Sequence, residues 1–232
     1  MKPPSKTWIE KSEENMKKVP FVLFLYLFPA ACLGIVALFH LKTGVAIRNF
    51  MSDPQAIVGV HPSVGAISTL GILFWCATAT ILIFTRSLRL PAGDSKYSMF
   101  ILFSGILTTI LMLDDAFMLH DALLPTYFGV KEIYSYILYS IFFFLGFIRF
   151  KKQILKTQYH LLLITFAFWG ASILFDLFQP DIESMIGGNW RILLEDGFKL
   201  LGIVAWFDYF SRTCRFRLEH PFHPKEASRP KK

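Results

Sequence analysis

Residues 64–85 read VGAISTLGILFWCATATILIFT and contain no charged side chain. A helix of this length extends about 33 Å, because an α-helix rises 1.5 Å per residue. The hydrocarbon core of a bilayer is about 30 Å thick, so this segment alone is long enough to cross it. The stretch therefore predicts a membrane-spanning helix.

Five further apolar segments have a similar length, and short connections with turn-forming residues separate them. With the first segment, the predicted spans are Val19–Leu41, Val64–Thr85, Met99–His120, Ile133–Phe150, Tyr159–Phe178 and Trp190–Ser211. Any one of them alone would also fit a buried helix of a soluble protein, but six in 232 residues leave no polar shell to cover them. We expect an all-α polytopic bundle of six transmembrane helices over residues 19–211, between basic segments 1–18 and 212–232.

The composition excludes several other classes of protein. Hydrophobic residues make up 54% and charged residues 18%, against about 25% charged in a soluble domain. Such hydrophobicity excludes an intrinsically disordered chain. Three cysteines without paired spacing exclude a disulfide scaffold. Walker, Rossmann and Gly-x-Ser-x-Gly motifs are absent from the sequence.

Basic residues are concentrated on one side of the predicted bundle. Nineteen of the 24 Lys and Arg residues lie before the first span, in the second and fourth loops, or after the last span. The other side has Lys42, Arg48, Lys131 and Arg191. The positive-inside rule then places both termini in the cytoplasm and the protein in the cytoplasmic membrane. The net charge of +7 is thus explained by membrane orientation and contact with lipid, not by nucleic acid.

The first span has a second interpretation that the sequence leaves open. Its apolar run follows Lys17 and Lys18, and Ala30-Ala31-Cys32 resembles a lipoprotein cleavage site. Cleavage there would leave five spans without changing the orientation of the rest.

Acidic residues within the predicted spans are the main functional signal. An Asp at the centre of a membrane helix costs about 2.5–3.5 kcal/mol on insertion scales. Asp208 has a plain partner in Arg212, four residues later. Five others lie at one depth, in the outer halves of the third, fifth and sixth spans. We expect these three helices to be neighbours. The five carboxylates should then line one polar cavity that binds a cation or protons, and they are Asp114, Asp115, Asp176, Glu195 and Asp196.

His120 follows at the same end and extends this set to metal ligation. The candidate metal ligands are Asp114, Asp115, His120, Asp176 and Glu195. Carboxylates with histidine suit Zn, Mn or Fe, whereas all-oxygen ligation suits Mg or Ca. Two basic residues offer partial neutralisation: Lys199 is expected to pair with Glu195 or Asp196, and Arg191 with Glu195. The remaining charge requires either protonated carboxyls or a bound cation.

Two segments carry a resemblance to known proteins. They are Leu113-Asp114-Asp115-Ala116-Phe117-Met118-Leu119-His120-Asp121 and Leu193-Leu194-Glu195-Asp196-Gly197-Phe198-Lys199-Leu200-Leu201-Gly202. Both are similar to segments of an uncharacterised group of bacterial multi-pass membrane proteins. That resemblance implies a membrane fold and no particular activity.

A shorter segment resembles the alkaline ceramidase-like membrane hydrolases. Ser104 followed by Leu113-Asp114-Asp115 is similar to their Ser-to-Leu-Asp-Glu segment. The resemblance implies a zinc enzyme that holds its metal with histidines, assisted by a Ser and an Asp. The chain departs from that pattern, because Thr108 stands where a His would be and the last span has no His-x-x-x-His pair.

Two functional classes follow from these residues. One is a membrane protein that binds or translocates a cation or protons through its carboxylates. The other is a metal-dependent hydrolase that acts on a lipid at the outer leaflet. The missing histidines favour the first class, whereas a site away from the bilayer midplane favours the second.

Overall fold

The computed structural model describes residues 19–88 and 95–219, with side chains from Tyr26 onward. Every regular element within these ranges is helical. The chain divides into two compact units, residues 1–64 and residues 65–232, which are described separately. Segment 1–18 and the end of the predicted basic tail, residues 220–232, lie outside the described residues.

The first unit contains one long helix, α2 (Val19–Thr43), and two short ones, α3 (Arg48–Met51) and α4 (Pro54–Val58). α2 is apolar over most of its length and has Pro29 in its interior. Local interactions terminate the helix at its C-terminal end. The Thr43 hydroxyl donates to the Phe39 carbonyl at 2.7 Å, and Gly44 adopts a left-handed conformation.

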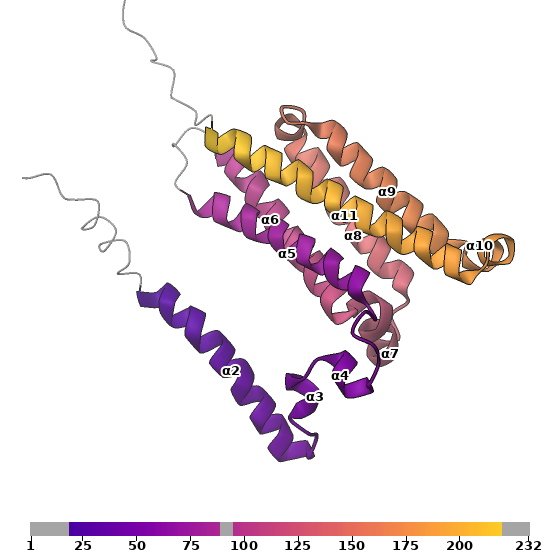
Figure 1. Cartoon of the computed structure of the whole chain (residues 1–232). Helices are drawn as coiled ribbons and strands as arrows, with labels where there is room; N and C mark the ends of the chain where they lie inside the picture. Colours follow the sequence, from indigo (N-terminus) through magenta and orange to yellow (C-terminus); the bar gives the residue numbers. More distant parts are fainter. Residues whose placement is uncertain (1–18, 89–94, 220–232) are drawn as a thin grey trace, which may run out of the picture. The chain divides into compact units, whose positions relative to one another are not determined.

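The second unit holds the remaining helices, and Figure 1 shows its long helices running alongside one another. They are α5 (Ala66–Ser87), α6 (Ser95–Phe117), the π-helical turn η1 (Leu119–Leu123), α7 (Leu124–Phe128), α8 (Glu132–Ile154), α9 (Tyr159–Leu177), α10 (Gln179–Ile186) and α11 (Gly188–Glu219). α5 packs against α6, and α11 packs against both α9 and α5.

Five helices in the described residues are long and apolar enough to cross a membrane. They are Tyr26–Thr43, Ala66–Ser87, Ser95–Phe117, Glu132–Ile154 and Tyr159–Leu177. The protein is thus an all-helical, multi-pass membrane protein. α11 is longer than any of the five and continues past Ser211, but Glu195, Asp196, Lys199 and Asp208 reduce its hydropathy.

The core of the second unit is aromatic. Trp75 of α5 and Trp206 of α11 are each 4% exposed, and their rings lie 6.5 Å apart between centroids. Trp169 of α9 contacts both of them, at 5.5 Å and 5.4 Å. Gly202 makes this possible, because a Cβ there would lie 2.3 Å from Cδ1 of Trp169. Three helices are therefore joined by a cluster of three indoles in tilted and edge-on contact.

The end of α6 differs from the predicted third span. The span was expected to continue to His120, but the helix ends at Phe117. Met118 adopts a left-handed backbone conformation with φ 47°, which a non-glycine residue rarely takes. The chain then turns through η1, so His120 does not lie on the α6 helix but folds back toward it.

Candidate functional site

The fold-back of η1 places His120 against Asp114. Asp114 is 2% exposed and accepts two hydrogen bonds from His120, one from the backbone N to Oδ1 at 3.0 Å and one from Nδ1 to Oδ2 at 2.5 Å. A single carboxylate thus fixes both the turn and the orientation of the imidazole. His120 itself is 7% exposed.

The second ring nitrogen of His120 faces two more carboxylates. Nε2 lies 2.8 Å from Oδ1 of Asp121 and 4.0 Å from Oε1 of Glu132, the first residue of α8. One ligand atom from each of these three residues lies within 4.8 Å of the other two. His120, Asp121 and Glu132 are therefore close enough together that they could hold a metal ion, and we refer to them as the HDE triad.

The imidazole is strongly basic in this setting. Burial acts to lower the pKa of His120, but its hydrogen bonds and charge interactions with Asp114 and Asp121 outweigh this and raise it to about 10. The hydrogen bond from His120 in turn lowers the pKa of Asp121. Without another cation, both ring nitrogens thus carry protons and donate to carboxylates.

Tyr136 extends the network to the fifth predicted span. Its hydroxyl lies 2.5 Å from Oε1 of Glu132, one helical turn earlier on α8, and 3.3 Å from Oδ2 of Asp176 on α9. The Tyr136 ring also packs beside His120, with centroids 5.5 Å apart. Four carboxylates are thereby linked through one histidine and one tyrosine: Asp114, Asp121, Glu132 and Asp176.

Asp115 belongs to a separate, adjacent interaction. Its Oδ1 lies 2.7 Å from Nζ of Lys199 on α11, and its Oδ2 accepts a hydrogen bond from Nε1 of Trp75 at 2.8 Å. The expected partner of Lys199, Glu195 or Asp196, is thus corrected to Asp115. Adjacent residues on a helix point about 100° apart, which is why Asp114 and Asp115 serve different networks.

The carboxylates of α11 lie in a different setting. Glu195 is paired with Arg191, which also approaches Glu183 of α10 at 3.8 Å. Asp196 is exposed and takes part in neither the HDE triad nor this pair. Asp208 pairs with Arg212 at 2.7 Å.

The structure therefore brings together only part of the predicted ligand set. Asp114, His120 and Asp176 share one network, whereas Asp115 is held by Lys199 and Glu195 by Arg191. Among the described residues, the His/Asp/Glu group close enough to hold a metal is the HDE triad, which shares His120 with the predicted ligand set. Asp115 and Glu195 instead form ion pairs with Lys199 and Arg191.

Comparison with known families gives one match. A family model described as a domain of unknown function (DUF8692) matches residues 25–213. The chain belongs to this family. This confirms the expected uncharacterised family, and no curated protein and no solved structure matches.

Three site residues of this DUF8692 member were not among the predicted ones: Asp121, Glu132 and Tyr136. Two signals in the sequence point to them. His120 and Asp121 are adjacent where the predicted third span ends, and Glu132 and Tyr136 have the i, i+4 spacing of side chains that meet on a helix. Sequence periodicity does not reveal the left-handed backbone conformation of Met118, which turns η1 back so that the His120 backbone N donates to Asp114.

Proposed function

We propose that the protein is a six-span protein of the cytoplasmic membrane that binds a divalent metal ion at the HDE triad, near the outer surface. The observation that carries the proposal is the position of His120 Nε2 between two carboxylates while Nδ1 is held by a third. Metal-binding histidines commonly donate their other ring N–H to a carboxylate, which fixes the ring and raises its basicity. Asp114 occupies that position here.

The charge balance of the site supports a cation. Lys199 pairs with Asp115, Arg191 with Glu195 and Glu183, Arg212 with Asp208 and Arg215 with Glu219, and none of these carboxylates belongs to the HDE triad. The network around His120 contains four carboxylates. One imidazolium offsets only one of those charges, so a divalent ion suits the site better than the protein's own cations.

The donor set favours a transition metal. One imidazole nitrogen with two carboxylates suits Zn, Mn or Fe, whereas Mg and Ca prefer oxygen alone. Three protein ligands leave a coordination position for another molecule, as in catalytic rather than structural metal sites. When bound, such a metal supplies a Lewis acid at this end of the bundle.

The topology of the proposal rests on charge placement. In the proposed topology, nineteen basic residues fall on the side of the termini and four on the side of the triad, and the positive-inside rule then orients the triad outward. α11 serves as the sixth span because its charges near the bundle are paired, with Arg191 on Glu195 and Lys199 on Asp115. Paired charges facing the bundle interior are the tolerated kind in a membrane.

The interior favours binding over translocation. Below the level of Asp115 the bundle is filled by side chains that are at most 2% exposed: Leu82, Ile101, Ile203 and Phe210. A cation crossing this core would lose both its protein ligands and its hydration water, at a cost of many kcal/mol.

A second candidate function is a metal-dependent hydrolase that acts on a lipid. The position of the three-ligand triad at the end of the apolar spans favours it.

Metal analysis of the purified protein tests the proposal. We expect about one zinc, manganese or iron ion per chain after exposure to each metal, in line with a three-ligand site. Asp121→Asn keeps the size of an exposed side chain and should abolish retention of the metal. Asp196→Asn changes an exposed carboxylate outside the triad and is the matched control. Equal metal in all three proteins, or none in any, would refute the proposal.

A further inference from the structure

The chain between α6 and α8 turns one polar residue inward and large apolar side chains outward. His120 is the buried residue of η1, and the five residues of α7, all within the described range, include none that is buried. We refer to residues 117–128 as the η1–α7 segment. Its large apolar side chains are 37–80% exposed, and they are Phe117, Met118, Leu123, Tyr127 and Phe128.

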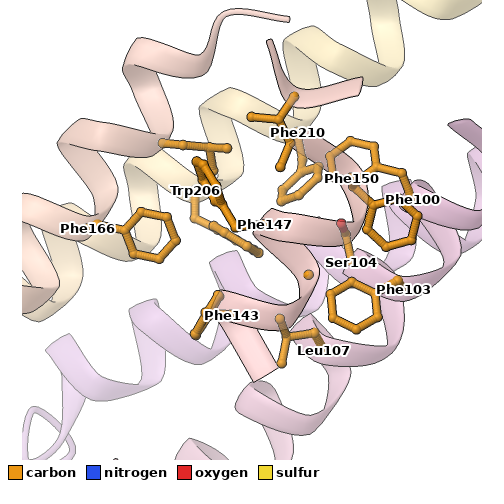
Figure 2. Close-up of a pocket in the computed structure, with 13 residues that line it drawn as sticks. Phe100, Phe103, Ser104, Leu107, Phe143, Phe147, Phe150, Phe166, Trp206 and Phe210 are labelled. Atoms are coloured by element: carbon orange, nitrogen blue, oxygen red, sulfur yellow. The ribbon is translucent and has the colours of Figure 1, made fainter. Parts of the chain in front are cut away.

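This surface differs from the aromatic packing inside the bundle. Figure 2 shows Phe143, Phe166 and Trp206 gathered around one interior space. The ring of Phe143 lies 5.4 Å from that of Phe166 and 5.7 Å from that of Trp206, between centroids. Tyr127 and Phe128 are instead largely exposed. Single exposed apolar side chains are common on proteins, but a contiguous group of them marks contact with a partner or a membrane.

The η1–α7 segment continues the lipid-facing side of α6. Four residues of α6 are 40–63% exposed and have the spacing of one helix face: Ile106, Ile110, Leu113 and Phe117. Because α6 is long and apolar enough to cross a membrane, this face contacts acyl chains. Phe117 is the last residue of α6 and the first of the segment. The exposed apolar surface therefore continues past the end of the span.

The position of the segment in the chain identifies what covers it. It connects the end of α6 with α8, which begins at Glu132 and is also long and apolar enough to cross a membrane. The segment therefore lies where the hydrocarbon core meets the lipid head groups. Tyrosine is enriched at this level, because its ring is apolar and its hydroxyl is polar. Apolar side chains of interfacial segments reach about 5–10 Å into this boundary.

We propose that the η1–α7 segment is an interfacial anchor whose apolar side chains insert among the lipids at this end of the bundle. His120 and Asp121 belong to the segment itself, so the anchor fixes the HDE triad at the level of the head groups. The side chains of Asp121 and Glu132 are partly exposed, which leaves the triad open to that layer. The anchor goes beyond metal binding. That a lipid head group is the molecule that reaches a bound metal rests on the proposed function.

Spin labelling measures the depth of the segment. In the full chain, the exposed Cys32 and Cys76 are changed to Ser, whereas the buried Cys214 is kept. A nitroxide is attached at Thr126→Cys, an exposed position that leaves both aromatic residues of α7 in place. The protein is reconstituted into vesicles of phosphatidylethanolamine and phosphatidylglycerol. Collisions of the label with oxygen, which concentrates in hydrocarbon, are compared with collisions with a water-soluble nickel complex.

Lipids with nitroxides at known depths calibrate the measurement. We expect the Thr126 label within about 5–10 Å of the boundary between head groups and acyl chains. A label at Ile110→Cys, on the lipid-facing side of α6, should lie deeper and provides the hydrocarbon reference.

Matched substitutions test whether the aromatic side chains determine this depth. Tyr127→Ser combined with Phe128→Ser should move the Thr126 label toward water by about 5 Å, because both removed rings are expected in the interface. Phe178→Ser, which changes an exposed aromatic residue after the end of α9, should leave the label at its original depth.

The outcomes distinguish the anchor from the metal site. A Thr126 label in bulk water, or one whose depth is unchanged in the double serine variant, would overturn the anchor. A label shielded from both oxygen and the nickel complex would also overturn it, since protein from the first unit or a second copy would then cover the segment. Metal content is measured in the same samples. A label at the interface in a protein that binds no metal would support the anchor and refute the metal site, whereas a bound metal with a label in water would do the reverse.

Discussion

Nζ of Lys199 lies 2.7 Å from Oδ1 of Asp115, and this ion pair joins α11 to α6. Asp115 also accepts a hydrogen bond from Trp75, so α5 is part of the same junction. Asp115 thus brings a counter-charge to Lys199 from a helix remote in sequence. The pair lies beside the HDE triad, since Lys199 also interacts electrostatically with Asp121.

Lys199→Met should therefore destabilise the bundle. Breaking a buried pair costs about 3–5 kcal/mol, and because the Lys199 side chain is 40% exposed we expect about 1–3 kcal/mol. Asp115→Asn in the same chain should restore part of the loss, whereas Glu195→Gln should not. Thermal unfolding measures both. Arg212→Met breaks an exposed pair and should leave the melting temperature unchanged.

Gly202 and Gly197 provide a matched pair on α11. Gly202→Ala places a methyl group 2.3 Å from Cδ1 of Trp169 and forces the cluster of indoles to move, at a cost of about 1–3 kcal/mol. Gly197→Ala meets nothing within 4 Å and should stabilise the helix by up to about 1 kcal/mol. Equal melting temperatures for the two variants would show that the indole cluster of Trp75, Trp169 and Trp206 is not rigidly packed.

Asp114→Asn tests the role of the carboxylate behind the histidine. The amide keeps the size of the side chain but removes the charge that orients and polarises His120. Replacement of such an outer partner reduces metal affinity by about 10–100-fold. Titration with a competing chelator measures this, with Asp208→Asn as a control that leaves affinity unchanged. If Asp114→Asn binds the metal with wild-type affinity, Asp114 does not support His120 in metal binding.

Metal binding should depend steeply on pH. The carboxylates raise the pKa of His120 to about 10 against the opposing effect of burial, so the imidazole is protonated at neutral pH in the metal-free protein. Nε2 must lose its proton before it binds a metal. Affinity should then rise about tenfold per pH unit between pH 6 and 9, until the His120 pKa is reached. Calorimetry in buffers of different ionisation enthalpy counts the released proton, and its absence would contradict His120 as a ligand.

Much of the fold is predictable from the sequence because long uncharged runs have one stable arrangement in a bilayer. The run from Val64 to Thr85 becomes α5 with ends shifted by two residues, and the Tyr159 run becomes α9. The end of the third span was predicted less well. Met118 takes its left-handed conformation because η1 and Asp114 hold it there, and no glycine marks the place.

The site was harder to predict because its partners come from different helices. Spacing along one helix correctly pairs Arg191 with Glu195 in the structure, but it assigns Lys199 to its own helix as well. A continuous helix would direct His120 away from Asp114, and only the turn at Met118 brings them into contact. Sequence periodicity predicts which residues share one face of a helix. It does not predict which faces of different helices pack together, and the residues that form a binding site depend on that packing.

The proposed site requires that one imidazole, that of His120, binds the metal together with carboxylates. X-ray absorption at the edge of the bound metal reports the ligands themselves. We expect a single imidazole among oxygen ligands, with a metal–nitrogen distance of about 2.0–2.1 Å for zinc. The imidazole signal should be lost in Asp121→Asn and retained in His61→Ala, which changes an exposed histidine of the first unit. A bound metal with several imidazoles or with none, or an imidazole signal that is unchanged in Asp121→Asn, would refute His120 as the ligand.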